Sequence, residues 1–247
     1  LHAKYLPANW KLCGNILALG VASFFTQVGA AIVSFVTNFL LVKYGAMHPV
    51  GADNALASIG LVMRVAMFTV MPLVGVSIAI QPILGFNYGA KLYCRVRETL
   101  RDGIIAATGI AVLMFAIVHI WPEQIVNMFG ITDEGLVTFT IFALKVMLFM
   151  LPVVGFQIVG ANYFQATGQP LKSSLLSLSR QILFLVPMLF ILPEVLPGIL
   201  PNVTGLDAIY IATPASDACA TILTLVFIII ELRRLHRLEN DQAAPQY

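Results

Sequence analysis

The amino-acid sequence predicts an all-α membrane protein, built as a bundle of six transmembrane helices. Of its 247 residues, 59% are hydrophobic and 11% are charged, and the mean hydropathy is +0.91. An ordinary soluble domain is about 25% charged, so the composition favours a bilayer. Six segments each hold the roughly 20 mostly apolar residues that a membrane-spanning helix needs. The basic residues gather in alternate connections between them.

The six predicted spans are separated by connections that contain turn formers and helix stops. The spans cover residues 15–42, 54–86, 103–121, 136–165, 174–192 and 206–231. Glycine and proline occur in the connections, as in Gly168-Gln169-Pro170, and these residues end helices. The second and fourth spans are long, which is typical of helices that tilt or kink in the bilayer.

The second and fourth spans carry the same internal pattern eighty positions apart. Each contains Pro-x-x-Gly, as Pro72 with Gly75 and as Pro152 with Gly155, followed by polar side chains and a glycine-ended exit. A proline inside a helix removes a backbone hydrogen bond and clashes one turn back, but a membrane bundle can satisfy the freed carbonyl group. We therefore expect both helices to bend at these residues. Paired broken helices indicate a transport pathway.

Basic residues predict the orientation of the bundle, because they concentrate on the cytoplasmic side of membrane proteins. With six spans, ten of them fall on one side: Lys4, Lys11, Lys91, Arg95, Arg97, Arg101, Lys172, Arg233, Arg234 and Arg237. The opposite side holds Lys43 and six acidic residues. Both termini are therefore expected in the cytoplasm. The basic stretch 88–101 is expected either to lie along the cytoplasmic headgroups or to form a solvated loop.

Four ionisable residues remain inside the predicted spans: Arg64, Lys145, Arg180 and Asp217. Each costs several kcal/mol at the bilayer centre unless it is paired or faces water. The three cations either extend to the interface or bind carbonyl groups that the prolines free, or they line a pathway and hold acidic groups of a partner. Asp217 is either a proton carrier or, as we favour, one half of a salt bridge with one of these cations.

Polar residues form a stripe on each of two predicted spans. In the first span Gln27, Ser34 and Asn38 recur at steps of seven and four, which places them on one helical face. The fourth span carries Gln157 and, beside the same face, Asn162. Such faces either join helices or line a wet cavity. The length of the first stripe favours a cavity, so these five residues are the predicted substrate pathway.

The sequence contains no enzymatic or metal-binding pattern. Its three cysteines are scattered, without a Cys-x-x-Cys pair or a cluster with histidine. It also lacks a phosphate-binding glycine loop and the hydrolase motifs, so active transport would use an ion gradient and no cofactor. A net charge of +2 is too small to indicate nucleic acid as a partner.

At several of these residues the chain resembles the multidrug and toxic compound extrusion (MATE) transporters. Residues 81–91, Gln-Pro-Ile-Leu-Gly-Phe-Asn-Tyr-Gly-Ala-Lys, resemble the exit of their eighth helix. Residues 164–170 with 179–181 resemble the passage between the tenth and eleventh helices. Residues 214–217, Pro-Ala-Ser-Asp, resemble the twelfth helix of the MepA-like bacterial branch. The similarity extends over essentially the whole chain.

The resemblance implies a fold, a partner and an activity. MATE transporters have twelve helices in two six-helix lobes around a central cavity. This chain then corresponds to the C-terminal lobe, with an N-terminal six-helix lobe as its partner. Residues 1–14 would be a cytoplasmic arm or inter-lobe linker, 15–231 the lobe and 232–247 a cytoplasmic tail. The whole transporter would export cationic or amphipathic drug-like compounds across the bacterial cytoplasmic membrane, in exchange for H+ or Na+.

Two departures from the family pattern concern ion coupling, and two alternative functions stay open. Some relatives carry an ion-coupling glutamate near the position of Thr26-Gln27, where this chain has no acid. MepA-like relatives carry the coupling aspartate in the N-terminal lobe, so we expect it outside this sequence. One alternative is a lipid-linked oligosaccharide flippase of the same superfamily, which needs clustered cations such as Arg64, Lys145 and Arg180. The other is a truncated lobe that only packs against another lobe.

Overall fold

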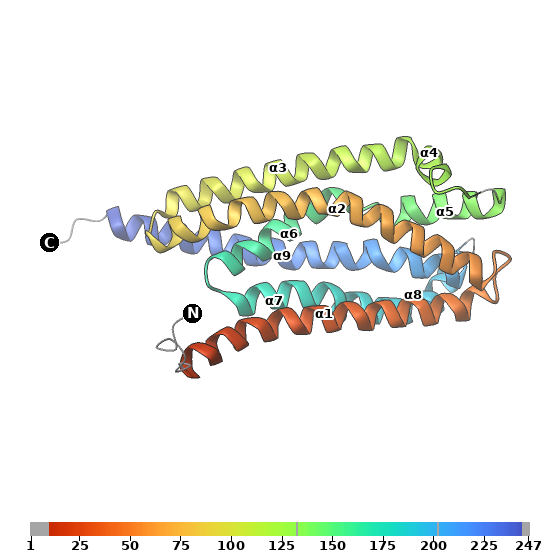
Figure 1. The fold of residues 1–247 in the computed structure, drawn as a ribbon, viewed down its shortest axis with the longest axis horizontal. Coiled ribbons are helices and arrows are strands. Elements are labelled where there is room, and N and C mark those ends of the chain that lie inside the picture. Colours follow the sequence, from red (N-terminus) through yellow and green to blue (C-terminus); the bar gives the residue numbers. More distant parts are fainter. Residues whose placement is uncertain (1–9, 132, 202, 244–247) are drawn as a thin grey trace, which may run out of the picture.

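The computed structural model describes residues 10–131, 133–201 and 203–243, and helices form most of that part of the chain (Figure 1). The long helices are α1 (Trp10–Gly45), α2 (Ala52–Gly89), α3 (Tyr93–Ile120) and α9 (Gly205–Ala243). The shorter elements are α4 (Pro122–Asn127), α5 (Glu134–Met147), α6 (Leu151–Ala166), α7 (Pro170–Leu178), the π-helix η2 (Ser179–Leu185) and α8 (Val186–Ile199). The described residues contain no β-strand, which confirms the all-α class.

Six passages of the chain have the length and composition of membrane spans. Five helical stretches qualify singly: α1, α2, α3, the run α7–η2–α8, and α9. α5 and α6 qualify together as a sixth, which bends by 46° at the break between Met147 and Leu151. The predicted six-helix bundle is therefore confirmed. In Figure 1 the start of α1 and the end of α9 lie at the same end of the bundle, as an even number of passages requires.

The first and last helices extend beyond the predicted spans. α1 already begins at Trp10, within the expected arm 1–14, and α9 continues to Ala243, well into the expected tail 232–247. Hydrophobic periodicity marks only the part of a helix that is buried or in lipid, so it does not show where a helix ends in water. The other residues of the arm, 1–9, and of the tail, 244–247, lie outside the described residues.

The basic stretch 88–101 is mostly helical, so the expectation of a solvated loop is wrong. It contains the end of α2 at Gly89, a tight turn, and the first turns of α3. Lys91 has a left-handed φ of 59°, and the Leu92 N–H donates to the Asn87 carbonyl at 2.9 Å. Because this turn reverses the chain directly, the basic residues that follow belong to the start of a span.

The two proline motifs take different structures. Pro152 is at the beginning of α6, directly after the 46° break, as expected for a bend. Pro72 lies inside α2, which continues without interruption from Ala52 to Gly89 and arches along its length in Figure 1. α2 is therefore curved but continuous at Pro72, without a break like the one before Pro152 (Figure 1). One proline removes a single backbone hydrogen bond, and the remaining bonds of a long packed helix keep it continuous.

The glycines of the two motifs also have different surroundings. A methyl group added at Gly155 would lie 2.9 Å from the Ala107 carbonyl oxygen, so α6 and α3 pack backbone to backbone here. Small residues allow such close approach between membrane helices. At Gly75 nothing lies within 4 Å of the corresponding position. Gly155 therefore serves helix packing, which the interpretation as a bending residue did not anticipate.

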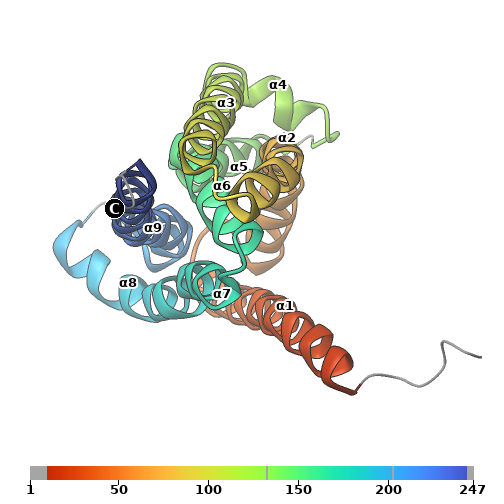
Figure 2. The same cartoon turned by 90° about the vertical axis from the view of Figure 1, so that its left-hand side faces the viewer.

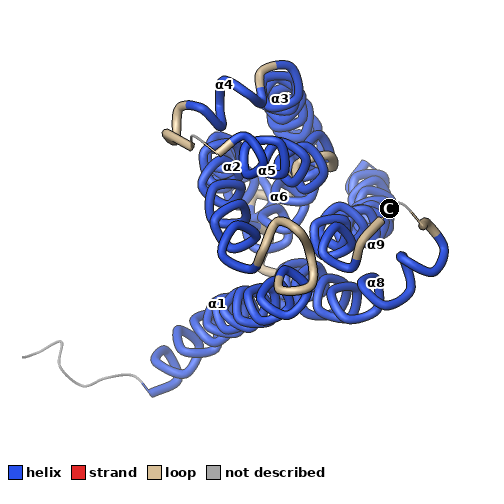
Figure 3. The backbone as a smooth tube through the Cα atoms, turned by 90° about the vertical axis from the view of Figure 1, so that its right-hand side faces the viewer, coloured by secondary structure: helices blue, strands red, loops and turns tan. Residues whose placement is uncertain are grey.

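Seen along the bundle, the helices form two groups (Figure 2, and from the opposite end Figure 3). α2, α3, α5 and α6 lie on one side, and α7, α8 and α9 lie on the other. α1 approaches α2 at the end where residues 46–51 connect them and diverges from it toward its own beginning (Figure 1). The diverging α1 leaves a large apolar surface exposed, including Phe24, Phe35 and Phe39.

We expect Gly155→Ala to destabilise the fold and Gly75→Ala to leave it intact. The first substitution forces α3 and α6 apart at an overpacked site, at a cost of about 1–3 kcal/mol. The second makes the same change at an open helical position, where alanine is the better helix former. Thermal unfolding followed by size-exclusion chromatography measures both variants. Equal melting temperatures would contradict the packing role of Gly155.

Candidate functional site

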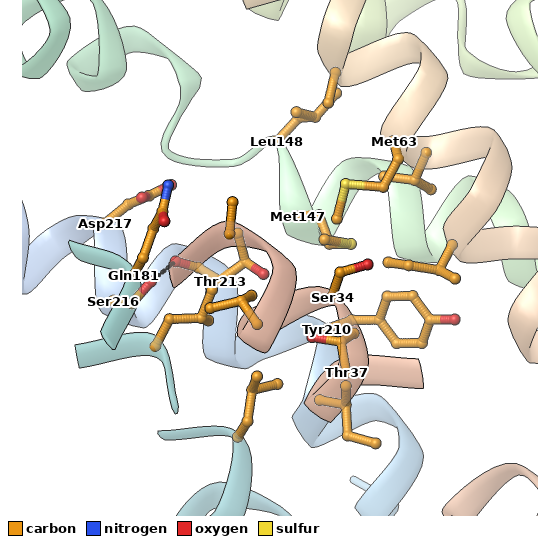
Figure 4. Close-up of a pocket in the computed structure, with 18 of the residues that line it drawn as sticks. Ser34, Thr37, Met63, Met147, Leu148, Gln181, Tyr210, Thr213, Ser216 and Asp217 are labelled. Atoms are coloured by element: carbon orange, nitrogen blue, oxygen red, sulfur yellow. Dashed lines mark hydrogen bonds between the residues drawn. The ribbon is translucent and has the colours of Figure 1, made fainter. Parts of the chain in front are cut away.

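A cavity of about 540 Å³ lies between α1, α2, η2 and α9. Its wall is mostly apolar and includes Met63 of α2, Met147 at the end of α5, and Leu148 in the break (Figure 4). Its polar lining is Ser34, Thr37 and Asn38 of α1, Arg180 and Gln181 of η2, and Tyr210, Thr213, Ser216 and Asp217 of α9. Apolar concavities of about 300–1,000 Å³ with a few polar groups are typical of small-molecule sites.

One ion pair lies in the wall of this cavity. The Arg180 Nε–H donates to Asp217 Oδ1 at 2.7 Å, which joins η2 to α9. The Asp217 side chain is 4% exposed, and that of Arg180 is 36% exposed. Of the three cations that the sequence offers as partners for Asp217, the structure selects Arg180. Since both residues line the cavity, their charges cancel within it.

Arg180 lies where the helix that begins as α7 becomes the π-helix η2, before it continues as α8. π-Helical turns are rare and often occur at functional sites. The next residue, Gln181, has a buried Oε1 atom that accepts no hydrogen bond from the described residues. Gln181, Ser216 and Asp217 lie at the same end of the cavity (Figure 4). This end therefore holds the acidic group of the cavity, while Ser34, Thr37 and Tyr210 lie toward the other end (Figure 4).

The structure brings part of the predicted pathway on α1 to this cavity. Ser34 and Asn38 line it, together with Thr37. Gln27 lies on the same stripe and is exposed, but it is two turns away from Ser34 and is not part of the lining. The α1 stripe thus contributes its second half, Ser34 and Asn38, to the cavity, whereas Gln27 is exposed outside the lining.

Gln157 and Asn162 lie outside the cavity lining and join helices. Gln157 Nε2 donates to the Asp217 carbonyl at 2.8 Å and to Thr221 Oγ1 at 2.6 Å, which ties α6 to α9. Asn162 Nδ2 donates to Ser77 Oγ at 2.6 Å and ties α6 to α2. Both interpretations of a polar stripe therefore apply in one lobe: the α1 stripe reaches a cavity, and the α6 stripe joins helices.

Arg64 and Lys145 do not join Arg180. Both side chains are exposed, and neither lines the cavity. Within the described part of the chain neither has an ion-pair partner. The three cations inside the spans are therefore separate, and no cationic cluster forms around the cavity.

Sequence reasoning finds Asp217 but misses the other polar residues on the α9 side of the cavity, although a signal for them is present. Tyr210, Thr213 and Asp217 recur at steps of three and four, so α9 carries a polar stripe like that of α1. Tyr210 is fully buried, and its hydroxyl group donates to the Ala55 carbonyl at 3.0 Å, which ties α9 to α2. The same stripe thus supplies a helix contact and the acidic end of the cavity.

A second buried carboxylate lies away from the cavity, beside the turn from α6 to α7. Glu231 of α9 is 1% exposed and accepts from Lys172 Nζ at 3.3 Å and from Gln169 Nε2 at 3.0 Å. Arg234 Nη1 adds a further contact at 3.2 Å. Glu231 therefore fastens the start of α7, and with it the helical run that carries Arg180, to α9.

The six passages define a multi-pass membrane protein with a cavity between its helices. The MatE family model matches residues 22–191, and the chain belongs to this family. The multidrug export protein MepA of Staphylococcus haemolyticus (strain JCSC1435) is 26% identical over 243 residues, 98% of this chain and 48% of the relative. MepA of Staphylococcus aureus (strain NCTC 8325 / PS 47) is 23% identical over 233 residues, 94% and 48% respectively. The chain thus spans about half the length of the curated relatives it matches.

Solved transporter structures share the fold. The MATE multidrug transporter DinF-BH, solved in complex with a ligand, is 34% identical with a TM-score of 0.70, over 85% of this chain and 44% of that chain. An inward-facing conformation of a multidrug resistance MATE family transporter of the MOP superfamily is 19% identical with a TM-score of 0.80, over 96% and 51%. The predicted resemblance to one half of a MATE transporter is therefore confirmed.

We expect Glu231→Gln to loosen the turn from α6 to α7, because the neutral amide no longer pairs with Lys172 and Arg234. Both partners are partly exposed, so the loss is about 1–2 kcal/mol. Hydrogen–deuterium exchange of residues 166–172 should rise. Glu239→Gln is the matched control, because Glu239 is 33% exposed and pairs with Arg97 at the surface. Faster exchange in both variants alike would contradict a specific role for Glu231.

Proposed function

We propose that this chain is the C-terminal lobe of a multidrug efflux antiporter. An N-terminal six-helix lobe completes the transporter, and the cavity between α1, α2, η2 and α9 is this lobe's part of the drug pathway. The whole protein exports cationic or amphipathic compounds in exchange for H+ or Na+. The MepA relatives, named as multidrug export proteins, and the multidrug transporter DinF-BH support this proposal.

The lining of the cavity is the observation that carries the proposal. Its wall combines the methionines Met63 and Met147 with short polar side chains and one ion pair whose charges cancel. Methionine is flexible and polarisable, so it adapts to ligands of different shape, and promiscuous binders use such surfaces. Ser34 and Asn38 offer hydrogen bonds on one side of the cavity. They do not require a ligand of one fixed shape. A broad substrate range is the function that this lining supports best.

The proposal includes a topology and a source of energy. Both termini lie in the bacterial cytoplasm, as the distribution of lysine and arginine favours. An ion gradient drives export, and the coupling carboxylate belongs to the other lobe, since Asp217 is held by Arg180. The break before Pro152 allows the α5–α6 span to change its bend while the two lobes alternate access.

The two alternative functions have less support. A flippase for anionic pyrophosphate lipids needs cations that face the pathway together, whereas Arg64 and Lys145 lie outside the cavity lining. A truncated lobe without transport activity differs from our proposal in one measurable respect. Co-expression with an N-terminal MATE lobe should restore drug efflux if the proposal holds, and should leave cells drug-sensitive if the lobe is inactive.

We expect the double substitution Ser34→Leu with Asn38→Leu to reduce efflux about tenfold or more, because it removes two of the three polar side chains that α1 presents to the cavity and fills the cavity. The measurement is efflux of a fluorescent cationic dye from cells that produce the complete two-lobe transporter, together with its amount in the membrane.

The matched control is Gln165→Leu, an equally polar-to-apolar change at an exposed position outside the cavity lining. It should leave efflux unchanged. Normal efflux in the double variant, at normal protein levels, would remove the cavity from the drug pathway.

A further inference from the structure

Asp217 is the acidic group of the cavity, but a ligand cannot reach it freely. Its side chain is 4% exposed, and Arg180 Nε holds Oδ1 at 2.7 Å. Arg180 and Asp217 are the charged residues in the cavity lining, so the cavity is neutral while they are paired. A cationic ligand would gain the carboxylate only after the guanidinium group leaves it.

The arginine is the more exposed partner of this pair. Its side chain is 36% exposed, whereas the carboxylate is held close to the α9 backbone among buried neighbours. A long cationic side chain can swing toward water and keep its charge solvated. Asp217 cannot do so, and a buried carboxylate without a cation is strongly unfavourable. The exchange of one cation for another at Asp217 is therefore the step that this geometry permits.

We propose that Arg180 acts as an intramolecular competitor for the Asp217 carboxylate. This competition determines how well the cavity discriminates between ligands of opposite charge. A lipophilic monocation competes with the guanidinium group for Asp217, so the closed pair weakens its binding. A neutral or anionic ligand of the same shape does not compete for the carboxylate. This inference rests on the proposed function, because it assumes that the cavity is the ligand site.

The test uses two ions of nearly the same shape and opposite charge, tetraphenylphosphonium and tetraphenylborate. Their binding to the 247-residue chain in lipid nanodiscs is measured by equilibrium dialysis, with empty nanodiscs as the blank. Arg180→Gln should tighten binding of the phosphonium ion about tenfold and not that of the borate ion. Asp217→Asn frees the guanidinium group, so it should tighten binding of the borate ion and weaken binding of the phosphonium ion.

Two further variants serve as controls. Arg64→Gln makes the same change as Arg180→Gln at an exposed cation outside the lining, and it should alter neither affinity. The double variant Arg180→Gln with Asp217→Asn should return both affinities to near their original values, because the cavity is neutral again. If Arg180→Gln aggregates in size exclusion, Asp217→Asn and the double variant decide the question.

The outcomes separate this inference from the proposed function. If Ser34→Leu with Asn38→Leu weakens the binding of both ions but the variants of Arg180 and Asp217 change neither affinity, the cavity binds ligands. The role of Arg180 as a competitor for Asp217 is then overturned. If no variant of the cavity changes the binding of either ion, the cavity is not the ligand site, and the proposed function fails together with the inference.

Discussion

A carboxylate in the apolar part of a membrane bundle must be neutralised, and the cavity side of this lobe depends on how Asp217 meets that requirement. Its partner Arg180 reaches it from η2 at 2.7 Å. That contact ties the α7–η2–α8 span to α9. It also makes one end of the cavity polar while its total charge stays near zero. The π-helical turn at Arg180 is thus found where a long helix has to present a charged side chain inward.

The opposite side of the lobe is held by contacts that converge on α6. Gly155 brings its backbone against α3, Gln157 ties it to α9, and Asn162 ties it to α2. Glu231 then binds the turn that follows it, through Gln169 and Lys172. Membrane helices gain little from the hydrophobic effect when they associate, so small residues and polar contacts have to supply specificity. α1 borders the cavity through Ser34, Thr37 and Asn38.

The sequence predicts the spans well because long apolar segments and Gly/Pro connections follow from bilayer thickness alone. It also predicts that Asp217 needs a cation, since burial of a lone charge is so unfavourable. It does not distinguish Gln157 from Ser34, because a polar residue on an apolar helix looks the same whether it faces a helix or a cavity. It likewise does not reveal that Gly155 is a contact with Ala107, nor that α2 stays continuous at Pro72, because neighbouring helices decide both.

The two proline motifs show how one sequence pattern leads to two structures. Backbone that is not helical can exist at membrane depth only where protein or a cavity covers it. The break between α5 and α6 satisfies this condition, since Met147, Leu148 and Leu151 around it all line the cavity. Hydrogen bonds within short turns satisfy the backbone of the break; for example, the Leu151 N–H donates to the Leu148 carbonyl at 3.1 Å. At Pro72, α2 stays helical, so of the two proline motifs only the one in the fourth span lies at an irregular part of the wall. The break therefore marks the cavity more reliably than the proline does.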